Sequence, residues 1–211
     1  MRLDHISYAC TKAEFTDVVQ GIGSELGATF RDGGRHPQFG TANFILPLAD
    51  GRYIEVVTAL DHPAAEKAAF GRAVSQRASD GGGWFSWVIA VDDISAVEER
   101  LGRPSREGHR IRPDGHQLRW KQIGVLDIME DPQLPFFVQW LSEAEDHPSA
   151  DPSAISIAKV ELAGDHDTIH AFVGDAAEQF LDGIAIEWVE DEEPGIKAVW
   201  FNTPNGLVRI S

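Results

Sequence analysis

Two side chains with metal-binding and acid–base chemistry lie in segments that otherwise look like buried strands. His5 is the third residue of "LDHISYAC", and Glu55 lies in "ADGRYIEVV". An imidazole and a carboxylate are common ligands of first-row divalent metals, and a carboxylate can also act as a general base. The alternative is a hydrogen-bonded polar pair lining a cavity, because a buried carboxylate must be paired or protonated. The residues alone leave both interpretations open.

A cluster of positive charge stands out in an acidic chain. Segment 103–121, "RPSREGHRIRPDGHQLRWK", holds six of the 18 lysines and arginines, whereas the whole chain has a formal net charge of −16. We predict that it forms a mouth for an anionic ligand, with Arg110 and Arg112 as forked donors. His109 adds to the cluster, and Trp120 would give the ligand an apolar wall. The alternative is that these arginines pair with surface acids, which contributes little to stability.

These residues belong to a pattern of strand, helix and further strands that recurs along the chain. The first pass begins with the strand around His5, continues with a helix that ends at Gly27, and closes with a hairpin at "ADG". The predicted parts are a first βαβββ unit (1–60), a connector helix and linker (61–83), a second βαβββ unit (84–144) and a third, degenerate unit (153–211). The predicted fold is therefore α+β, with repeated units forming a cup-shaped mixed sheet and helices outside.

Strand alternation predicts which side chains face the cup. In the first strand Leu3, His5 and Ser7 share one face, and Glu55 lies on the matching face of a later strand. Phe137 is expected to line or floor the cavity. His36, next to a proline in "GGRHPQFG", is expected in a surface loop.

Composition narrows the classes of partner. A net charge of −16 disfavours binding to nucleic acid or to an anionic membrane surface. No run is apolar for long enough to span a membrane, and the N-terminus lacks a signal-peptide pattern. The single cysteine, Cys10, fits a reducing compartment. We expect a cytoplasmic protein that binds a small molecule.

The repeated unit, with "LDHISYAC" as its first strand and "ADGRYIEVV" as its last, resembles the vicinal-oxygen-chelate superfamily. That superfamily includes glyoxalase I, extradiol dioxygenases and bleomycin-resistance proteins. "RIRPDGHQLRW" and "LPFFVQW" resemble an uncharacterised glyoxalase-like bacterial branch. The resemblance covers residues 1–141 well, and the third unit is similar only as a worn copy.

The resemblance implies four positions that converge in the cup, two from each unit. In this sequence they are His5, Glu55, Ser86 and Gln139. The implied metal ligands are His5, Glu55 and Gln139, holding a nickel, zinc, manganese or iron ion, with Glu55 also as catalytic base. Ser86 is a poor ligand and is expected to contact substrate.

Two functions follow from this reasoning. The first is a metal-dependent, glyoxalase-like lyase or isomerase acting on a small, oxygen-rich, anionic metabolite. Its substrate-binding residues would be Ser86, His109, Arg110, Arg112, Trp120 and Phe137. The alternative is a metal-free binding or sequestration protein that uses the same cup, as bleomycin-resistance members do. The unpaired third unit suggests a homodimer.

Overall fold

The computed structural model describes residues 1–174 and 184–211. Residues 175–183, part of the predicted third unit, lie outside this description. The first part of the chain forms β1 (Arg2–Ala9), α1 (Phe15–Leu26), β2 (Arg31–His36), β3 (Thr41–Leu48) and β4 (Arg52–Ala59). The second part forms α2 (Pro63–Lys67), α3 (Ala69–Ser79), β5 (Gly83–Ala90), α4 (Ser95–Leu101), β6 (Arg106–Ile111), β7 (Gln117–Ile123), α5 (Asp127–Glu130) and β8 (Phe136–Trp140). The last part forms a 3-10 turn (Ala144–Asp146), β9 (Ser156–Ala163), α6 (His166–Val173), β10 (Ala185–Val189), β11 (Gly195–Thr203) and β12 (Gly206–Ile210).

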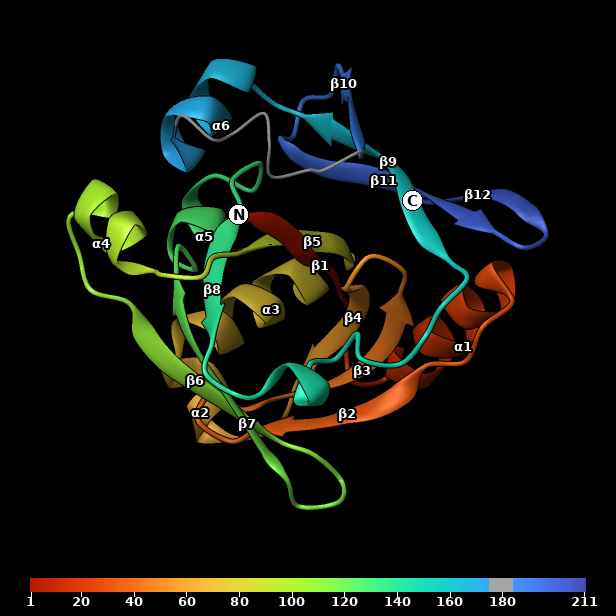
Figure 1. The fold of residues 1–211 in the computed structure, drawn as a ribbon, viewed down its shortest axis with the longest axis horizontal. Coiled ribbons are helices and arrows are strands. Elements are labelled where there is room, and N and C mark those ends of the chain that lie inside the picture. Colours follow the sequence, from red (N-terminus) through yellow and green to blue (C-terminus); the bar gives the residue numbers. More distant parts are fainter. Residues whose placement is uncertain (175–183) are drawn as a thin grey trace.

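Two similar halves close into one barrel (Figure 1). The strand order around it is β1-β4-β3-β2-β6-β7-β8-β5. In each half the first strand runs parallel to the last, β1 beside β4 and β5 beside β8, and the halves meet along the antiparallel pair β1 and β5. The other seam, between β2 and β6, has one register pair, Arg35 with Ile111. The predicted fold class of repeated units around a cup is confirmed.

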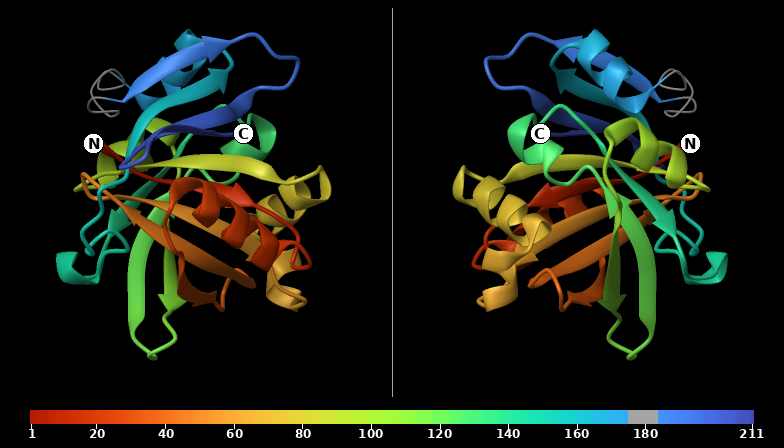
Figure 2. Two further views of the ribbon diagram at one scale, coloured as in Figure 1. Left: turned by 90° about the vertical axis from the view of Figure 1, so that its right-hand side faces the viewer. Right: turned by 90° about the vertical axis from the view of Figure 1, so that its left-hand side faces the viewer.

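One end of the barrel is closed by the connector helix. Phe70, Ala73 and Val74 of α3 pack in the same buried apolar cluster as Phe85 and Val88 of β5. Figure 2 shows α3 on one side of the barrel and the segment after β8 on the other. The helix predicted as a connector is therefore also a structural plug, because its apolar face fills the end of the barrel.

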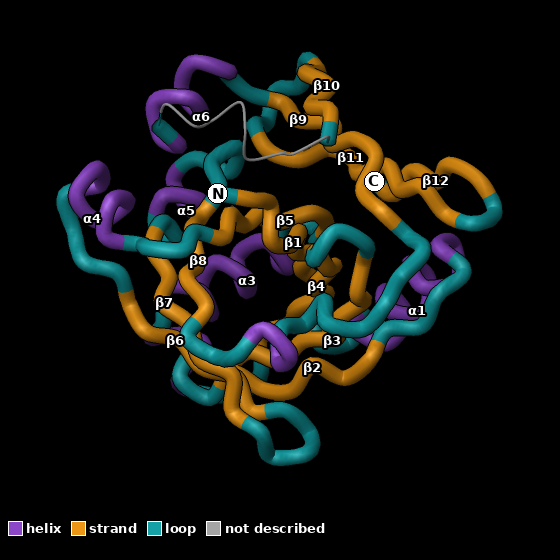
Figure 3. The backbone as a smooth tube through the Cα atoms, in the orientation of Figure 1, coloured by secondary structure: helices purple, strands orange, loops and turns teal. Residues whose placement is uncertain are grey.

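The segment that follows β8 crosses the opposite end. Figure 3 shows it as a loop with a short helical turn in front of the barrel. Here we call residues 144–152 the strap. Arg31 of β2 donates to the carbonyl oxygen of Pro148 at 2.7 Å and pairs with Asp151. His116 contacts Asp146 at 3.0 Å. These contacts fix the strap over the mouth of the cup.

The last part of the chain forms a separate four-stranded sheet of order β10-β9-β11-β12. It repeats the order of strand, helix and strands. In each half of the barrel the first strand pairs with the last, whereas here the first strand, β9, pairs with β10 and β11. Phe201 of this sheet packs with Leu3, Ile6 and Trp84 on the outer face of β1 and β5. The Trp84 indole also donates to the Ile210 carbonyl at 2.9 Å. The third sheet thus covers apolar barrel surface that would otherwise face solvent.

Within the described residues, no helix has the length and apolar character needed to cross a membrane.

Candidate functional site

The barrel holds a cavity of about 30 Å³, with Phe70 of α3 at one end. Its walls are aromatic, with polar groups concentrated on the side of the first unit. The lining side chains are His5, His36, Phe39, Asn43, Tyr53, Glu55, Phe70, Arg110, Trp120, Gln122, Phe136, Val138 and Trp140. The two halves line the cavity with different chemistry. In the second half β8 contributes three apolar or aromatic side chains, whereas in the first half β1 contributes a histidine and β4 a carboxylate.

A β-bulge brings two neighbouring side chains of β1 together. In the pairing with β5, Leu3 lies opposite Ile89 and His5 opposite Val88, so Asp4 is the extra residue. A bulge of this kind breaks strict alternation and re-aims side chains. The fully buried Asp4 carboxylate accepts a hydrogen bond from His5 Nδ1 at 2.9 Å. Leu3 packs outside the barrel, so the predicted shared face of Leu3 and His5 is wrong.

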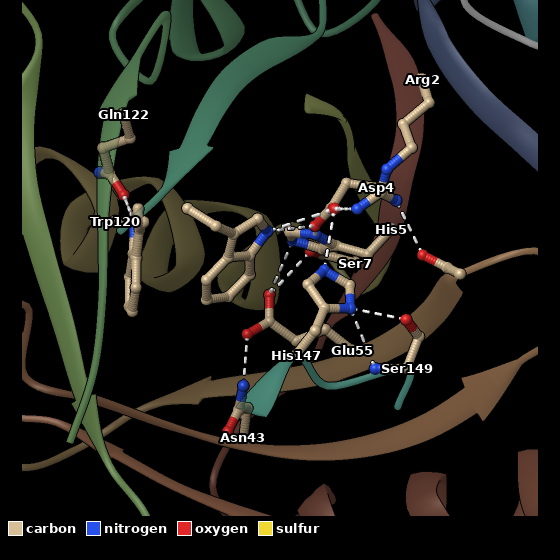
Figure 4. Close-up of polar contacts among 12 residues, drawn as sticks. Arg2, Asp4, His5, Ser7, Asn43, Glu55, Trp120, Gln122, His147 and Ser149 are labelled. Carbon is tan, nitrogen blue, oxygen red and sulfur yellow. Dashed lines mark hydrogen bonds and ion pairs between the residues drawn. The ribbon is translucent and has the colours of Figure 1, made fainter. Parts of the chain in front are cut away.

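Asp4 also binds the strap. Its Oδ1 accepts from His147 Nε2 at 3.1 Å and lies 3.1 Å from Arg2 Nη2. His147 Nδ1 lies 2.6 Å from the Ser149 hydroxyl and accepts from the Ser149 amide at 3.2 Å. Figure 4 shows His147 next to Asp4 and His5. Burial, the largest single influence, raises the pKa of Asp4, but the hydrogen bonds and the electrostatic attraction of His147 and His5 together outweigh it, so the pKa lies well below its usual value and the carboxylate is ionised. Both histidines therefore carry a proton on the nitrogen facing Asp4.

Glu55 is held at both oxygens. Ser7 Oγ donates to its Oε2 at 2.8 Å, and Asn43 Nδ2 donates to its Oε1 at 2.6 Å. His5 Nε2 lies 3.9 Å from Oε2. Burial raises the pKa of Glu55, but the neighbouring His5 and His36 and the two hydrogen bonds outweigh burial, so its pKa lies below 4.5. The site therefore holds an ionised carboxylate facing an oriented imidazole (Figure 4).

Arg110 is a buried cation that faces this pair from β6. It is 2% exposed and lines the cavity. Its Nε and Nη2 atoms are buried and have no hydrogen-bond partner among the described residues. Burial is the main reason that its pKa is lowered, although Tyr53 and Glu55 counteract the shift. Leaving buried donors unpaired is costly, so this side chain stands out as one arranged for a ligand.

His36 is inside the cup rather than in a surface loop, so that prediction is wrong. It is the last residue of β2, 4% exposed, and its Nδ1 lies 2.8 Å from the Thr41 hydroxyl. Burial lowers its pKa to about 4, and the nearby cation of Arg110 adds to the shift. The ring is therefore neutral at pH 7.

The predictions that placed Gln139 and Phe137 in the cup are wrong. Side chains at 136, 138 and 140 line the cavity, so alternation along β8 sends 137 and 139 outward. Gln139 accepts from the Ile94 amide at 3.2 Å and donates to the Asp92 carbonyl at 2.9 Å. Phe137 packs on Phe172 of α6, with ring centroids 5.8 Å apart. The prediction for "FFVQW" therefore took the wrong alternate residues of this strand as the ones that face the cavity.

The remaining predicted residues are distributed between the cup and its rim. Trp120 lines the cavity and donates to Gln122 Oε1 at 2.7 Å. Arg112 holds the strap instead of the cup, with Nη2 donating to the Asp146 carbonyl at 3.0 Å. His109 is half-buried and is not part of the lining. Ser86 is fully buried opposite Ser7, and its hydroxyl lacks a described partner. Whether these residues contact substrate stays a prediction.

Sequence reasoning missed Asp4, His36, Asn43 and His147. Thr41 and Asn43 are two residues apart in an otherwise apolar strand, so they share one face of it. This spacing of polar residues could have been used to predict that Asn43 faces the cavity. Asp4 could not be found by alternation, because its orientation depends on the bulge. His147 comes from a linker, and only the path of the strap brings it to Asp4.

The described residues do not fit the predicted divalent-metal site. His5 Nε2 and Glu55 Oε2 are 3.9 Å apart, but Gln139 lies on the opposite face of β8. In the part of the chain that the structure describes, no group of three or more histidine, cysteine or acidic side chains could hold a metal ion. Both Glu55 oxygens already accept hydrogen bonds, and the unpaired Arg110 cation in the same cavity opposes a second cation.

Comparison with known proteins now identifies the family. A model described as "Glyoxalase-like domain" matches residues 3–177. The chain belongs to this family, within the vicinal-oxygen-chelate superfamily. No curated protein matches this glyoxalase-like chain.

One solved structure shares the fold over the whole chain, and two further ones match it in part. A hypothetical protein from Staphylococcus aureus is 14% identical with a TM-score of 0.68, over 100% of this chain and 98% of that one. Methylmalonyl-CoA epimerase from Mycobacterium tuberculosis is 14% identical with a TM-score of 0.43, over 66% and 86%. Streptomyces coelicolor methylmalonyl-CoA epimerase in complex with 2-nitronate-propionyl-CoA is 16% identical with a TM-score of 0.41, over 66% and 93%. Identities this low concern the fold and not the activity.

Proposed function

We propose that this glyoxalase-like protein is an isomerase- or lyase-type enzyme that moves a proton on a small, oxygen-rich, anionic metabolite. The observation that carries the proposal is the pair formed by the Glu55 carboxylate and the Asp4-oriented His5 imidazole in one buried cavity. Family membership supports this class of chemistry without naming a substrate.

Glu55 is the proposed proton acceptor. It is ionised at neutral pH, because hydrogen bonds and nearby imidazoles lower its pKa, and it lies in a site from which most water is excluded. His5 is the proposed partner that stabilises charge or returns the proton on the other side of the substrate. Asp4 is a positioning residue: its carboxylate fixes the His5 tautomer and leaves Nε2 directed toward Glu55.

Hydrogen exchange with solvent tests the proposal without a known substrate. The protein would be incubated in D2O with a panel of short 2-oxo aldehydes, 2-oxo acids and 2-hydroxy acids, and C–H loss followed by proton NMR. Glu55→Gln, which keeps the shape and removes the base, should lower the exchange rate at least 100-fold. Glu187→Gln, on β10 outside the cup, should exchange at the wild-type rate. Exchange that survives Glu55→Gln would contradict the assignment.

The donor set favours a reaction independent of metal, rather than the nickel, zinc, manganese or iron site that the family resemblance implied. His5 and Glu55 supply two ligands where the prediction required three. We expect well under one ion per chain after reconstitution with each metal, and exchange that a chelator does not change. One tightly held ion per chain, lost in His5→Ala, would restore the metal-dependent hypothesis.

The second candidate is a metal-free binding protein. The observation in its favour is the apolar character of the walls given by the second unit, Trp120, Phe136 and Trp140. A ligand that raises the melting temperature of wild type and Glu55→Gln equally, with no exchange in any compound, would favour it.

Two further predictions from the sequence are kept as proposals. A homodimer would cover the edges of the third sheet, where Trp188 is 39% and Leu207 57% exposed, and light scattering that gives a monomer at micromolar concentration would exclude it. A cytoplasmic location rests on the presence of a single cysteine, Cys10.

A further inference from the structure

The edge of Arg110 that lacks partners is the edge that binds carboxylates. In a guanidinium group the Nε–H and one Nη–H point in the same direction and can grip two oxygens of a planar anion through parallel hydrogen bonds. Nε and Nη2 are the two atoms of Arg110 without described partners, and both are fully buried. No carboxylate among the described residues lies within 4.0 Å of this side chain. Among the described residues, the fork therefore has no anionic partner.

A further unpartnered atom, an acceptor, lies near the Nη1 end of the Arg110 guanidinium. Asn43 Oδ1 is buried and lacks a partner among the described residues, while its Nδ2 binds Glu55. Both side chains approach Gly33, the extra residue of a bulge in β2 opposite Asn43. A Cβ at Gly33 would be 2.2 Å from Asn43 Oδ1 and 3.1 Å from Arg110 Nη1. Because Gly33 has no side chain, the side chains of Asn43 and Arg110 can both lie against its backbone.

The size of the cavity limits the ligand to a few atoms. About 30 Å³ is room for roughly two or three water molecules, so the cup as it stands admits only a very small ligand. That excludes a nucleotide or a long acyl chain from the cup as it stands.

We propose that the cup binds a short 2-hydroxycarboxylate, the size of glycolate or lactate. Its carboxylate accepts two hydrogen bonds from the Nε and Nη2 edge of Arg110, and its hydroxyl donates to Asn43 Oδ1. Such a ligand leaves none of the three atoms unpaired. Because Asn43 Nδ2 donates to Glu55, the bound ligand would lie close to the proposed base. The binding of a 2-hydroxycarboxylate does not depend on the proposed enzymatic function. Only the step in which Glu55 removes a proton from this ligand rests on that function.

Binding is tested in full-length Glu55→Gln, so that a missing reaction cannot be mistaken for missing binding. Titration calorimetry would compare glycolate with glycolamide, which is neutral, with acetate, which has no hydroxyl, and with inorganic phosphate, which is tetrahedral. Glycolate should bind at least tenfold more tightly than glycolamide and phosphate, because only it satisfies the charged fork. It should bind several-fold more tightly than acetate, through the single bond to Asn43.

Variants check that Arg110 is the group responsible. Arg110→Lys keeps the charge, loses the fork, and should weaken glycolate binding at least tenfold. Arg119→Lys, an exposed arginine paired with Glu107, should bind glycolate as the parent does. If Arg110→Lys fails to fold, the comparison of glycolate with glycolamide in the parent still decides the matter. Equal binding of those two compounds, or no binding of glycolate, would overturn the assignment.

Discussion

Lowering the pH from 7 to 4.5 should destabilise this protein through His36. Burial, with a further contribution from Arg110, lowers the pKa of His36 to about 4 from its ordinary 6.5, and Glu55 only partly compensates. The unfolded chain therefore binds a proton near pH 6.5, whereas the folded protein does not bind it until about pH 4. Since the unfolded state holds more protons between these values, folding stability falls as the pH falls.

The magnitude follows from the size of the shift. A difference of 2.5 pKa units corresponds to about 3 kcal/mol when the pH is below both values. Over the range from pH 7 to 4.5, the same two pKa values give a loss of about 2 kcal/mol. Glu55 and Asp4 have pKa values lowered below 4.5 and 3.8, so their contributions are present above those values and are lost chiefly at lower pH. Between pH 7 and pH 4.5 the change in the free energy of unfolding therefore reports chiefly on His36.

Urea titrations at half-unit steps of pH would measure this loss. His36→Asn can keep a polar contact to Thr41 but does not titrate. Between pH 7 and pH 4.5 its free energy of unfolding should therefore fall by about 2 kcal/mol less than that of the wild type. His166→Asn, an exposed residue of α6, should follow the wild-type profile. A His36→Asn profile parallel to that of wild type would show that the ring titrates normally and would refute its burial as a neutral group.

Three further perturbations test other parts of the site. Asp4→Asn should cost about 1–3 kcal/mol in urea unfolding at pH 7, because it replaces a buried carboxylate that accepts hydrogen bonds from His5 and His147 and leaves one of these donors without its acceptor. Gly33→Ala should cost about 1–3 kcal/mol and weaken glycolate binding, since its Cβ would collide with Asn43. Asp146→Ala removes the carboxylate contacts of the strap to Arg112 and His116 but keeps the hydrogen bond from Arg112 to the backbone carbonyl of residue 146. It should cost under about 1 kcal/mol and speed hydrogen exchange in the strap.

Local chemistry in the sequence predicted the repeated units that form the cup, and the structure shows that they close into a barrel. The helix that ends at Gly27 does so in the left-handed conformation expected of such a cap, with φ 66°. The alternation in "ADGRYIEVV" placed Glu55 in the cup, because β4 is regular along its whole length and pairs without a shift with β1 and β3. Where strands are regular, period-two reasoning identifies the inward face.

The same reasoning failed where a strand departs from regularity or where its phase is ambiguous. Asp4 reaches the side of His5 through a bulge that depends on the pairing with β5. Both faces of the segment "FFVQW" carry a large aromatic residue, since β8 lies between the cavity and α6. Its sequence therefore does not reveal which residues point inward, and Gln139 was assigned to the wrong face.

The sequence by itself determined the order of elements, the repeated unit, and the presence of His5 and Glu55 on cup-forming strands, because these depend on local periodicity; it placed Arg110 in a loop at the mouth, whereas the structure places it on β6. Only the tertiary structure decided that Arg110 would be left without a carboxylate, that His36 would be buried and neutral, and that His147 would arrive from the strap. Each of these depends on which distant segments close the barrel. Burial and pairing are properties of that closure and not of any one stretch of chain.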